Sequence, residues 1–243
     1  MSVTQSLGDR MVEYQNVSNI RLMKRTPVII QVDGKGFHNF TRGMKKPFDM
    51  GLVENMWNTA QYMCENIEGA KLAYTQSDEI SILLTNYDTL NQGAFFDFRV
   101  QKLASIAASL ATAGFNQTGR FKKVACFDGR CFNLDREEVN NFMVWRQQDC
   151  TRNSIQMVAQ HYFSQKELNG KNQNELQEML FAKHGINWNY LETYLKRGSC
   201  VIKGHDGNWK IDHDIPVFRS DRSYIEHFAF PERSVSVGKI LIT

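Results

Sequence analysis

The chain has 243 residues, 42% of them hydrophobic and 12% aromatic, which is enough to bury a core and excludes a mostly disordered protein. Its net charge of +3 permits a nucleic-acid partner without requiring one. Five cysteines without a CxxC pair argue against a disulfide scaffold or a structural zinc site, and the lack of a signal sequence or a long apolar run predicts a soluble, cytoplasmic protein with no membrane span.

The first predicted elements are a helix and a buried strand. Residues 9–25 carry apolar side chains among charged ones, which predicts an amphipathic helix packed on the body of the protein. The mostly apolar run from Val28 to Val32 is rich in β-branched residues and stops at an acidic residue and two glycines, as a buried strand before a turn does. Asp33 is therefore expected at a strand end.

A second helix and a hairpin follow. Residues 52–67 have apolar positions three and four apart, which is typical of a helix that lies on a sheet. Residues 71–74 and 80–84 are predicted strands, and the short polar segment between them indicates a hairpin. Asp78 then lies at or beside the turn.

A third helix is predicted over residues 98–115, and a fourth strand over residues 123–127, before Asp128 and Gly129. The order of strand, helix, two-stranded hairpin, helix and strand is typical of the ferredoxin-like split βαβ arrangement. We therefore predict an α+β fold with an antiparallel sheet and helices on one face, formed by residues 1–136.

The second part, residues 137–243, is predicted to be mainly helical and to pack on the first part as one unit. Asp135, with Glu138 three residues later, forms a capping pattern that opens a helix reaching about residue 163. A further helix is expected over residues 175–183. The polar face of the long helix recurs at Arg146, Asp149 and Asn153.

Asp33 and Asp78 can converge because the first and third strands of a split βαβ sheet are neighbours. Two carboxylates suit Mg²⁺, which prefers oxygen ligands and keeps positions open for phosphate oxygens. Two such ions about 4 Å apart can activate an attacking oxygen and stabilise a leaving one at phosphorus. Gly34 can add a backbone carbonyl, and a turn with Gly34 and Gly36 lets a triphosphate approach closely.

Each of these residues also has an ordinary structural explanation. Aspartates are common in turns because they hydrogen-bond their own backbone. Glu79 can be a solvated carboxylate, and a lone histidine such as His38 is more often structural than a base. Lys46 and Arg130 can meet phosphates, but exposed basic residues usually bind nothing specific. Only the joint occurrence of these residues favours a site.

Five motifs follow one another along the chain: DGKGFHNF, YTQSDEISILL, the helix with Lys102 and SIAAS, FDGR, and MVWRQQD. In this order they resemble the tRNA-His guanylyltransferase (Thg1) family and its Thg1-like relatives, over roughly residues 27–155 with weaker similarity to about Val201. The resemblance implies a palm-like catalytic domain of the type found in 5′-to-3′ polymerases, which agrees with the predicted strand order. It also implies a nucleotidyltransferase that acts on tRNA 5′ ends.

The resemblance implies a role for each matching residue. Asp33, Asp78 and the Gly34 carbonyl would hold two Mg²⁺ ions, and Glu79 would join the two aspartates as a catalytic residue. The implied nucleotide-binding residues are Gly34, Lys35, Gly36, Phe37, His38, Lys46, Ser77 and Asp78. Candidates for contacts with the RNA end or its triphosphate are Arg99, Lys102, Arg130 and Asn153. The implied substrates are ATP and GTP or another nucleoside triphosphate, with tRNA as the partner and a homotetramer as the assembly.

The chain departs from the family at two places. Lys35 stands where the family commonly has Arg, which puts a bidentate phosphate contact in doubt. Members that add a guanylate to tRNA-His carry His-Ile-Asn-Asn after the WRQ-D motif, whereas residues 151–154 here read Thr-Arg-Asn-Ser. The sequence therefore resembles the Thg1-like branch, which favours template-directed 3′-to-5′ addition and the repair of truncated tRNA 5′ ends.

Three other functions stay open at this point. One is a tRNA-His guanylyltransferase that adds a single 5′ G. Another is a nucleotide cyclase built on a similar palm, against which the lack of a GGDEF-like stretch counts. The third is a non-catalytic RNA-binding module, because a split βαβ sheet can present stacking aromatics, but the sequence lacks the RNP1 pattern.

Overall fold

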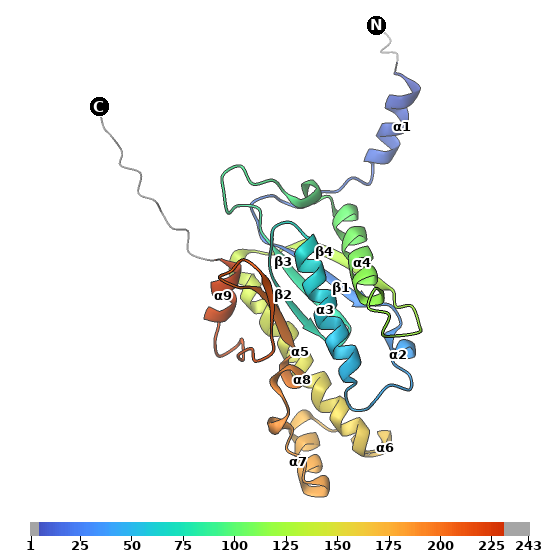
Figure 1. The fold of residues 1–243 in the computed structure, drawn as a ribbon, viewed down its shortest axis with the longest axis vertical. Helices are drawn as coiled ribbons and strands as arrows, with labels where there is room; N and C mark the ends of the chain where they lie inside the picture. Colours follow the sequence, from blue (N-terminus) through green and yellow to red (C-terminus); the bar gives the residue numbers. More distant parts are fainter. Residues whose placement is uncertain (1–4, 231–243) are drawn as a thin grey trace, which may run out of the picture.

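A six-stranded antiparallel sheet forms the centre of the computed structural model, which describes residues 5–230 (Figure 1). Its strand order is β4-β1-β3-β2-β5-β6. The first four strands are β1 (Val28–Gly34), β2 (Ala70–Gln76), β3 (Glu79–Leu84) and β4 (Phe127–Asn133). Their order, β4-β1-β3-β2, is that of the split βαβ arrangement. The predicted fold class is confirmed.

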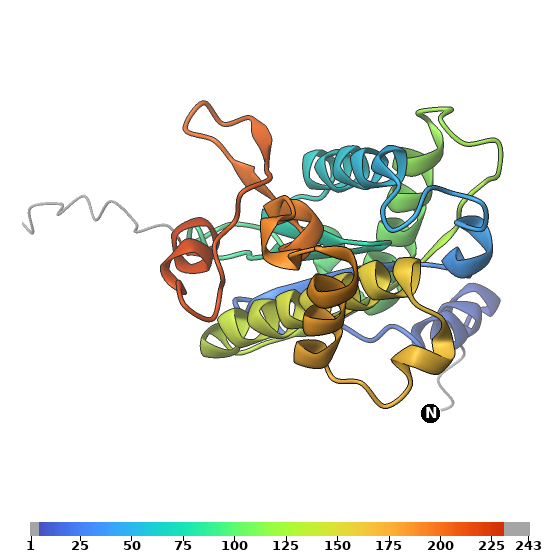
Figure 2. The same ribbon diagram turned by 90° about the horizontal axis from the view of Figure 1, so that it is seen from below.

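Helices cover both faces of this sheet (Figure 2). α3 (Met50–Asn66) and α4 (Val100–Asn116) pack on one face, and α5 (Arg136–Tyr162) lies across the other. Because successive side chains of a strand point to opposite faces, Val28, Ile30 and Val32 join the core under α3 and α4, whereas Ile29 joins the core under α5. The same alternation directs Gln31 and Asp33 to the α5 face.

The C-terminal part adds two strands that the sequence analysis did not predict. β5 (Ser199–Lys203) pairs with β2, and β6 (Trp209–Asp212) pairs with β5, so both parts share one sheet. β5 has too few residues to show a clear alternation of apolar and polar side chains. Its partner strand, β2, is also far away in the sequence, so no local hairpin signal exists. The remaining helices, as far as the structure describes the chain, are α2 (Phe37–Phe40), η1 (Phe95–Phe98), α6 (Gln165–Leu168), α7 (Gln173–His184), η2 (Trp188–Tyr190), α8 (Thr193–Arg197) and α9 (Ser223–Ala229). None of the described helices is long and apolar enough to cross a membrane.

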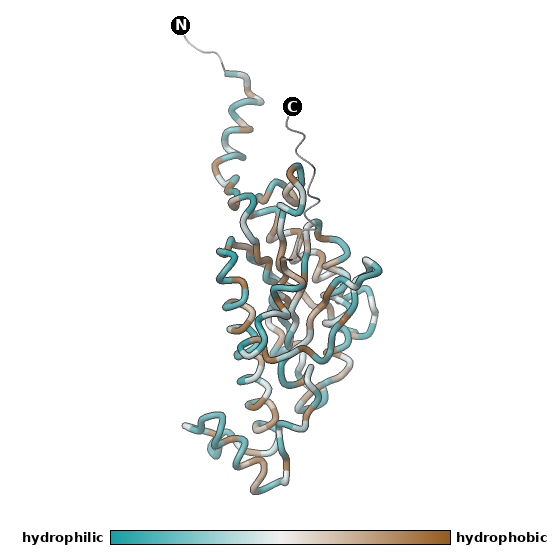
Figure 3. The backbone as a smooth tube through the Cα atoms, turned by 90° about the vertical axis from the view of Figure 1, so that its left-hand side faces the viewer, coloured by the Kyte–Doolittle hydropathy of each residue, from teal (hydrophilic) through white to brown (hydrophobic). Residues whose placement is uncertain are grey.

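The N-terminal helix differs from the prediction. α1 spans only Leu7–Asn16, buries none of its residues and stands away from the body (Figures 1 and 3). Its apolar side chains, among them Met11 and Tyr14, are exposed. The expectation that residues 9–25 form one helix packed on the body is therefore wrong. An amphipathic pattern shows that a helix has an apolar face, but it does not show what covers that face.

Two further corrections concern β4 and the start of α5. The fourth strand begins at Phe127, where the sequence analysis ended it, so Asp128 and Gly129 lie within it. Gly129 is required there because a Cβ would lie 2.6 Å from the carbonyl oxygen of Ala104 in α4. Asp135 does occupy the N-cap of α5, but its side chain makes no capping hydrogen bond.

Candidate functional site

Two aspartates meet at one end of the sheet. Asp33 is the next-to-last residue of β1, and Asp78 lies in the two-residue turn between β2 and β3. The antiparallel pairing of β1 with β3 places Asp33 opposite Glu79, the residue after Asp78. The backbone N–H of Gly34 donates both to the carbonyl of Asp78, at 3.2 Å, and to the Asp33 carboxylate, at 3.1 Å. The strand end and the hairpin turn are thus joined through their backbones.

The residues after Asp33 form a tight turn clamped by aromatic rings. A Cβ on Gly34 would lie 2.2 Å from the ring of Phe37, and Gly36 has a φ of +66°, which favours glycine. Phe37 packs against Phe40 and Phe115, with ring centroids 4.9 and 5.7 Å away. The buried rings fix the backbone of this turn beside the two aspartates.

Burial and like charge raise the pKa of both carboxyl groups. Burial raises the pKa of Asp33, the Asp128 carboxylate raises it further, and the Gly34 N–H together with Arg130 and Arg146 opposes the rise. Burial raises the pKa of Asp78 to about 6, and the charge of Asp33 adds to this effect. Two desolvated carboxylates that repel each other are stabilised by a cation between them.

The donors present fit magnesium. Mg²⁺ is usually held by one or two carboxylates together with substrate phosphates and water, rather than by a closed cage of side chains. Within residues 5–230, no group of three or more His, Cys, Asp or Glu side chains is placed to hold a metal. Two carboxylates, Asp33 and Asp78, are therefore the proposed side-chain donors, and the Gly34 carbonyl is a proposed third donor.

The raised pKa of Asp78 predicts how stability depends on pH. The folded state holds the proton of this carboxyl up to about pH 6, whereas the unfolded chain releases it near 3.8. The contribution of Asp78 to the unfolding free energy therefore falls as pH rises from about 4 to 6, by up to about 3 kcal/mol. Thermal unfolding in EDTA at pH 4.0 and 7.5 should show most of this loss in the wild type and not in Asp78→Asn. Equal pH dependence of the two proteins would contradict the assignment.

Glu79 has partners that give it a different environment from the two aspartates. Arg146 of α5 places Nη2 2.5 Å from one oxygen of Glu79 and 3.0 Å from Asp149. Gln31 donates from Nε2 to the other oxygen of Glu79 at 2.6 Å, and Ser81 donates to that oxygen at 3.3 Å. Both oxygens of Glu79 are therefore held within the α5 face of the sheet. The catalytic role predicted for Glu79 stays a prediction, and the geometry favours a role in positioning the hairpin.

The sequence analysis gave no role to Arg146, although it noted the polar face of α5. The Arg146 side chain is 8% exposed, and its Nε has no hydrogen-bond partner among the described residues. A polar Gln31 in an otherwise apolar strand was the available signal, because a buried amide needs a partner. The sequence could not show that the partner of Gln31, Glu79, also binds Arg146 of α5, which is 67 residues further along the chain.

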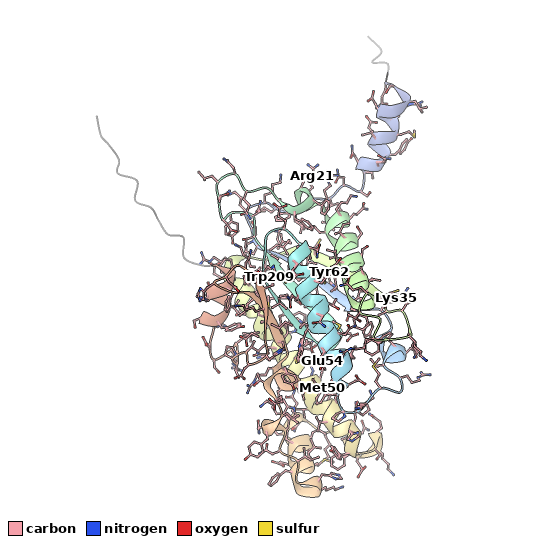
Figure 4. All side chains as sticks on the ribbon, viewed as in Figure 1. Arg21, Lys35, Met50, Glu54, Tyr62 and Trp209 are labelled. Carbon is pink, nitrogen blue, oxygen red and sulfur yellow. The ribbon has the colours of Figure 1, made fainter. Side chains whose placement is uncertain are left out.

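A cavity of about 250 Å³ opens beside Asp78. Five predicted nucleotide-binding residues line it, namely Phe37, His38, Lys46, Ser77 and Asp78. Lys45 and Asp49, the N-cap residue of α3, also line it. Lys35 is exposed and does not line the cavity; it lies at the edge of the molecule (Figure 4). The arrangement offers cationic side chains beside a carboxylate pair, which suits a triphosphate with a bound divalent ion.

The four candidates for RNA-end contacts lie on three different elements: Arg130 in β4, Arg99 and Lys102 at the start of α4, and Asn153 in α5. Arg130 of β4 is close enough for its positive charge to lower the pKa of Asp33. Arg99 and Lys102 are exposed at the start of α4. This end of the helix contacts β4 at Cys131, whose thiol donates to the Val100 carbonyl. The two aspartates lie toward the other end of β4, because Asp33 pairs with Asp128. The described structure therefore does not bring Arg99 and Lys102 together with Asp33 and Asp78, and their role stays a prediction.

The stretch Thr151 to Ser154 is tied into the fold. Thr151 donates to the carbonyl of Lys196 in α8 at 3.2 Å, and Ser154 accepts from the indole of buried Trp188 at 3.0 Å. Asn153 donates to Asp149 at 3.4 Å and lines a second, largely apolar pocket of about 90 Å³ between α3, α5 and α8. Two of the four side chains thus anchor the segments that follow α7.

Comparison with known proteins gives consistent results. Residues 8–135 match the tRNAHis guanylyltransferase family, and residues 137–226 match the Thg1 C terminal domain. A bacterial tRNA(His) guanylyltransferase (Thg1)-like protein solved in complex with ATP has a TM-score of 0.89 and 48% identity, over 93% of this chain and 100% of that chain. A second structure, of a bacterial Thg1-like protein in complex with GTP, has a TM-score of 0.80 and 44% identity over the same shares. The tRNA(His) guanylyltransferase of Schizosaccharomyces pombe is 31% identical, over 75% of this chain and 76% of its own length.

Proposed function

The chain belongs to the tRNAHis guanylyltransferase family of nucleotidyltransferases, and we propose that it is a 3′-to-5′ nucleotidyltransferase that repairs truncated tRNA 5′ ends by template-directed addition. The observation that carries the reaction class is the pair of desolvated aspartates, Asp33 and Asp78, beside a cavity lined by Lys45 and Lys46. The repair assignment rests on the stretch from Thr151 to Ser154, which replaces the His-Ile-Asn-Asn of the tRNA-His-specific branch.

The proposed reaction has two displacements at phosphorus. In the first, an oxygen of the RNA 5′-monophosphate attacks the α-phosphorus of ATP, and pyrophosphate leaves. In the second, the 3′-hydroxyl of an incoming nucleoside triphosphate attacks the RNA 5′ phosphorus, and AMP leaves. An RNA that already carries a 5′-triphosphate enters at the second step and releases pyrophosphate. The new nucleotide is selected by pairing with the opposing strand.

This chain's residues would serve both displacements from one position. Asp33 and Asp78, with the Gly34 carbonyl, would hold two Mg²⁺ ions, which stabilise negative charge on attacking and leaving oxygens. His38, Lys46 and Ser77 line the cavity and would hold the triphosphate. Because both steps place charge on phosphate oxygens, one set of fixed cations and dipoles can stabilise both transition states.

The relatives solved with ATP and with GTP support nucleoside triphosphates as substrates. We also propose a cytoplasmic homotetramer, on the basis of the family resemblance. The exposed apolar side chains of the N-terminal segment support association, because a monomer rarely exposes so many together. These include Leu7, Met11, Val12, Tyr14, Val17, Ile20 and Met23.

A competition between two RNAs tests the repair assignment. One is a tRNA that lacks its first 5′ nucleotide, with any anticodon, and the other is full-length tRNA-His. We expect the enzyme to restore the truncated tRNA with the complementary nucleotide and to slow once the acceptor stem is complete. Sequencing of the 5′ ends after reaction with all four nucleotides measures both products.

A truncated tRNA with a changed opposing base is the internal control, because the added nucleotide must change with it. Preference for untemplated G addition, confined to tRNA with the His anticodon, would contradict repair and favour a tRNA-His guanylyltransferase, as in the S. pombe relative. Consumption of ATP or GTP without RNA would instead indicate a cyclase.

A further inference from the structure

Two loops at the aspartate end of the sheet carry an unusual concentration of positive charge. Residues 35–48 and 116–127 together contain seven Lys and Arg and no Asp or Glu. The whole chain has a net charge of only +3, so the rest of the chain is net negative. The seven residues are Lys35, Arg42, Lys45, Lys46, Arg120, Lys122 and Lys123, and all are exposed. We call them the basic surface.

The two loops form one continuous surface. The backbone N–H of Lys35 donates to the Cys126 carbonyl at 2.8 Å, and Lys123 Nζ donates to the Asn39 carbonyl at 3.2 Å. Phe121 packs on Phe40, with ring centroids 5.5 Å apart. Figure 1 shows α2 beside the loop between α4 and β4, in line with these contacts.

The charges of this surface are mostly unpaired. Arg120 is bound to Glu54 at 2.7 Å, whereas the other six make no ion pair within residues 5–230. Clustered like charges repel one another, so six unpaired cations together cost free energy in the isolated protein. A polyanion removes that cost, and the surface continues directly into the cavity beside Asp78, since Lys45 and Lys46 belong to both.

Both loops are held in place before any partner binds. The side chain of Asn116 accepts from the Ala125 N–H at 2.9 Å and donates to the Ala125 carbonyl at 2.8 Å, which closes the loop that presents Lys122 and Lys123. In the other loop, the Asp49 carboxylate accepts from the Lys45 N–H at 3.1 Å. Loops that are already ordered lose less conformational entropy on binding.

We propose that the basic surface binds the phosphate backbone of the RNA strand whose 5′ end enters the Asp33–Asp78 site. This assignment rests on the proposed function and adds where the RNA lies: across the two loops, on the side of β4 and α2. Lys122 and Lys123, which do not line the cavity, bind RNA phosphates and not the incoming nucleotide.

Binding of a 5′-truncated tRNA transcript, measured without nucleotides over a series of salt concentrations, tests the proposal. Lys122→Gln/Lys123→Gln should lower the slope of log affinity against log salt by about 2 and weaken binding about ten- to hundred-fold at 0.1 M salt. ATP binding by the same variant, measured by titration calorimetry, should stay unchanged. Lys166→Gln/Arg219→Gln is the matched control, since both residues are exposed, make no ion pair within the described chain and lie outside the two loops.

An unchanged salt slope in the Lys122/Lys123 variant would overturn the proposal, as would an equal loss in the Lys166/Arg219 control. The proposed function fails separately. Suppose that the wild type binds the transcript with a steep salt dependence, that the Lys122/Lys123 variant loses this dependence, and that the wild type never extends the transcript. This result would refute tRNA repair and leave the RNA surface established.

Discussion

Asp33→Asn and Asp78→Asn should each abolish both activation of the RNA 5′ end and nucleotide transfer. Each change keeps the shape of the side chain but removes a negative charge from a site where the charge of Asp33 acts on Asp78. Bound metal ions supply several kcal/mol of transition-state stabilisation. Since each 1.36 kcal/mol is a factor of ten, both rate constants should fall by on the order of a thousand-fold or more. Single-turnover assays of each step measure the losses.

Asp206→Asn is the matched control for these variants, because Asp206 lies in the turn between β5 and β6. If Asp78 were only a turn residue, the two variants would behave alike. Misfolding is tested separately. Removing the charge of a carboxyl group whose pKa is raised to about 6 should leave the metal-free protein as stable as the wild type or more stable at pH 7.5. Loss of one step with the other intact would contradict a shared site.

Arg146→Ala should cost about 3–5 kcal/mol of unfolding free energy, the largest stability effect that we expect from one substitution. The Arg146 side chain is 8% exposed, and it is bound by the side chains of Glu79 and Asp149, which are 14% and 18% exposed. Its removal leaves the Glu79 carboxylate without its cation, away from water. Urea unfolding at a fixed protein concentration measures the loss.

Arg152→Ala is the control on the same helix. Arg152 binds the same Asp149 carboxylate, but its side chain is 51% exposed, so its loss should cost less than about 1 kcal/mol. Arg146→Met combined with Glu79→Gln should recover part of the loss, because no unpaired charge then remains buried. A cost for Arg146→Ala as small as that for Arg152→Ala would contradict the assignment of a buried ion pair.

Sequence patterns were sufficient for the elements that carry the aspartates. The β-branched run before Asp33 and the apolar runs on either side of Asp78 predicted β1, β2 and β3, because burial on a sheet imposes that composition locally. The patterns failed at β4. Its Asp128 and Gly129 look like a turn, but the strand pairs with β1 and needs a small residue under α4.

The sequence alone determined the fold class and the family, because each depends on residues close together in the chain or on motifs in a fixed order. The metal chemistry of Asp33 and Asp78 stays a prediction from the same motifs. The tertiary structure decided what depends on contacts between distant segments. It buried Arg146 against Glu79, added β5 and β6 to the open edge of β2, and joined the loops of Lys35 and Lys123 into one surface. The physical reason is that a buried charge or a strand edge pairs with whichever segment the fold places beside it. The local pattern of apolar and polar residues does not identify that partner.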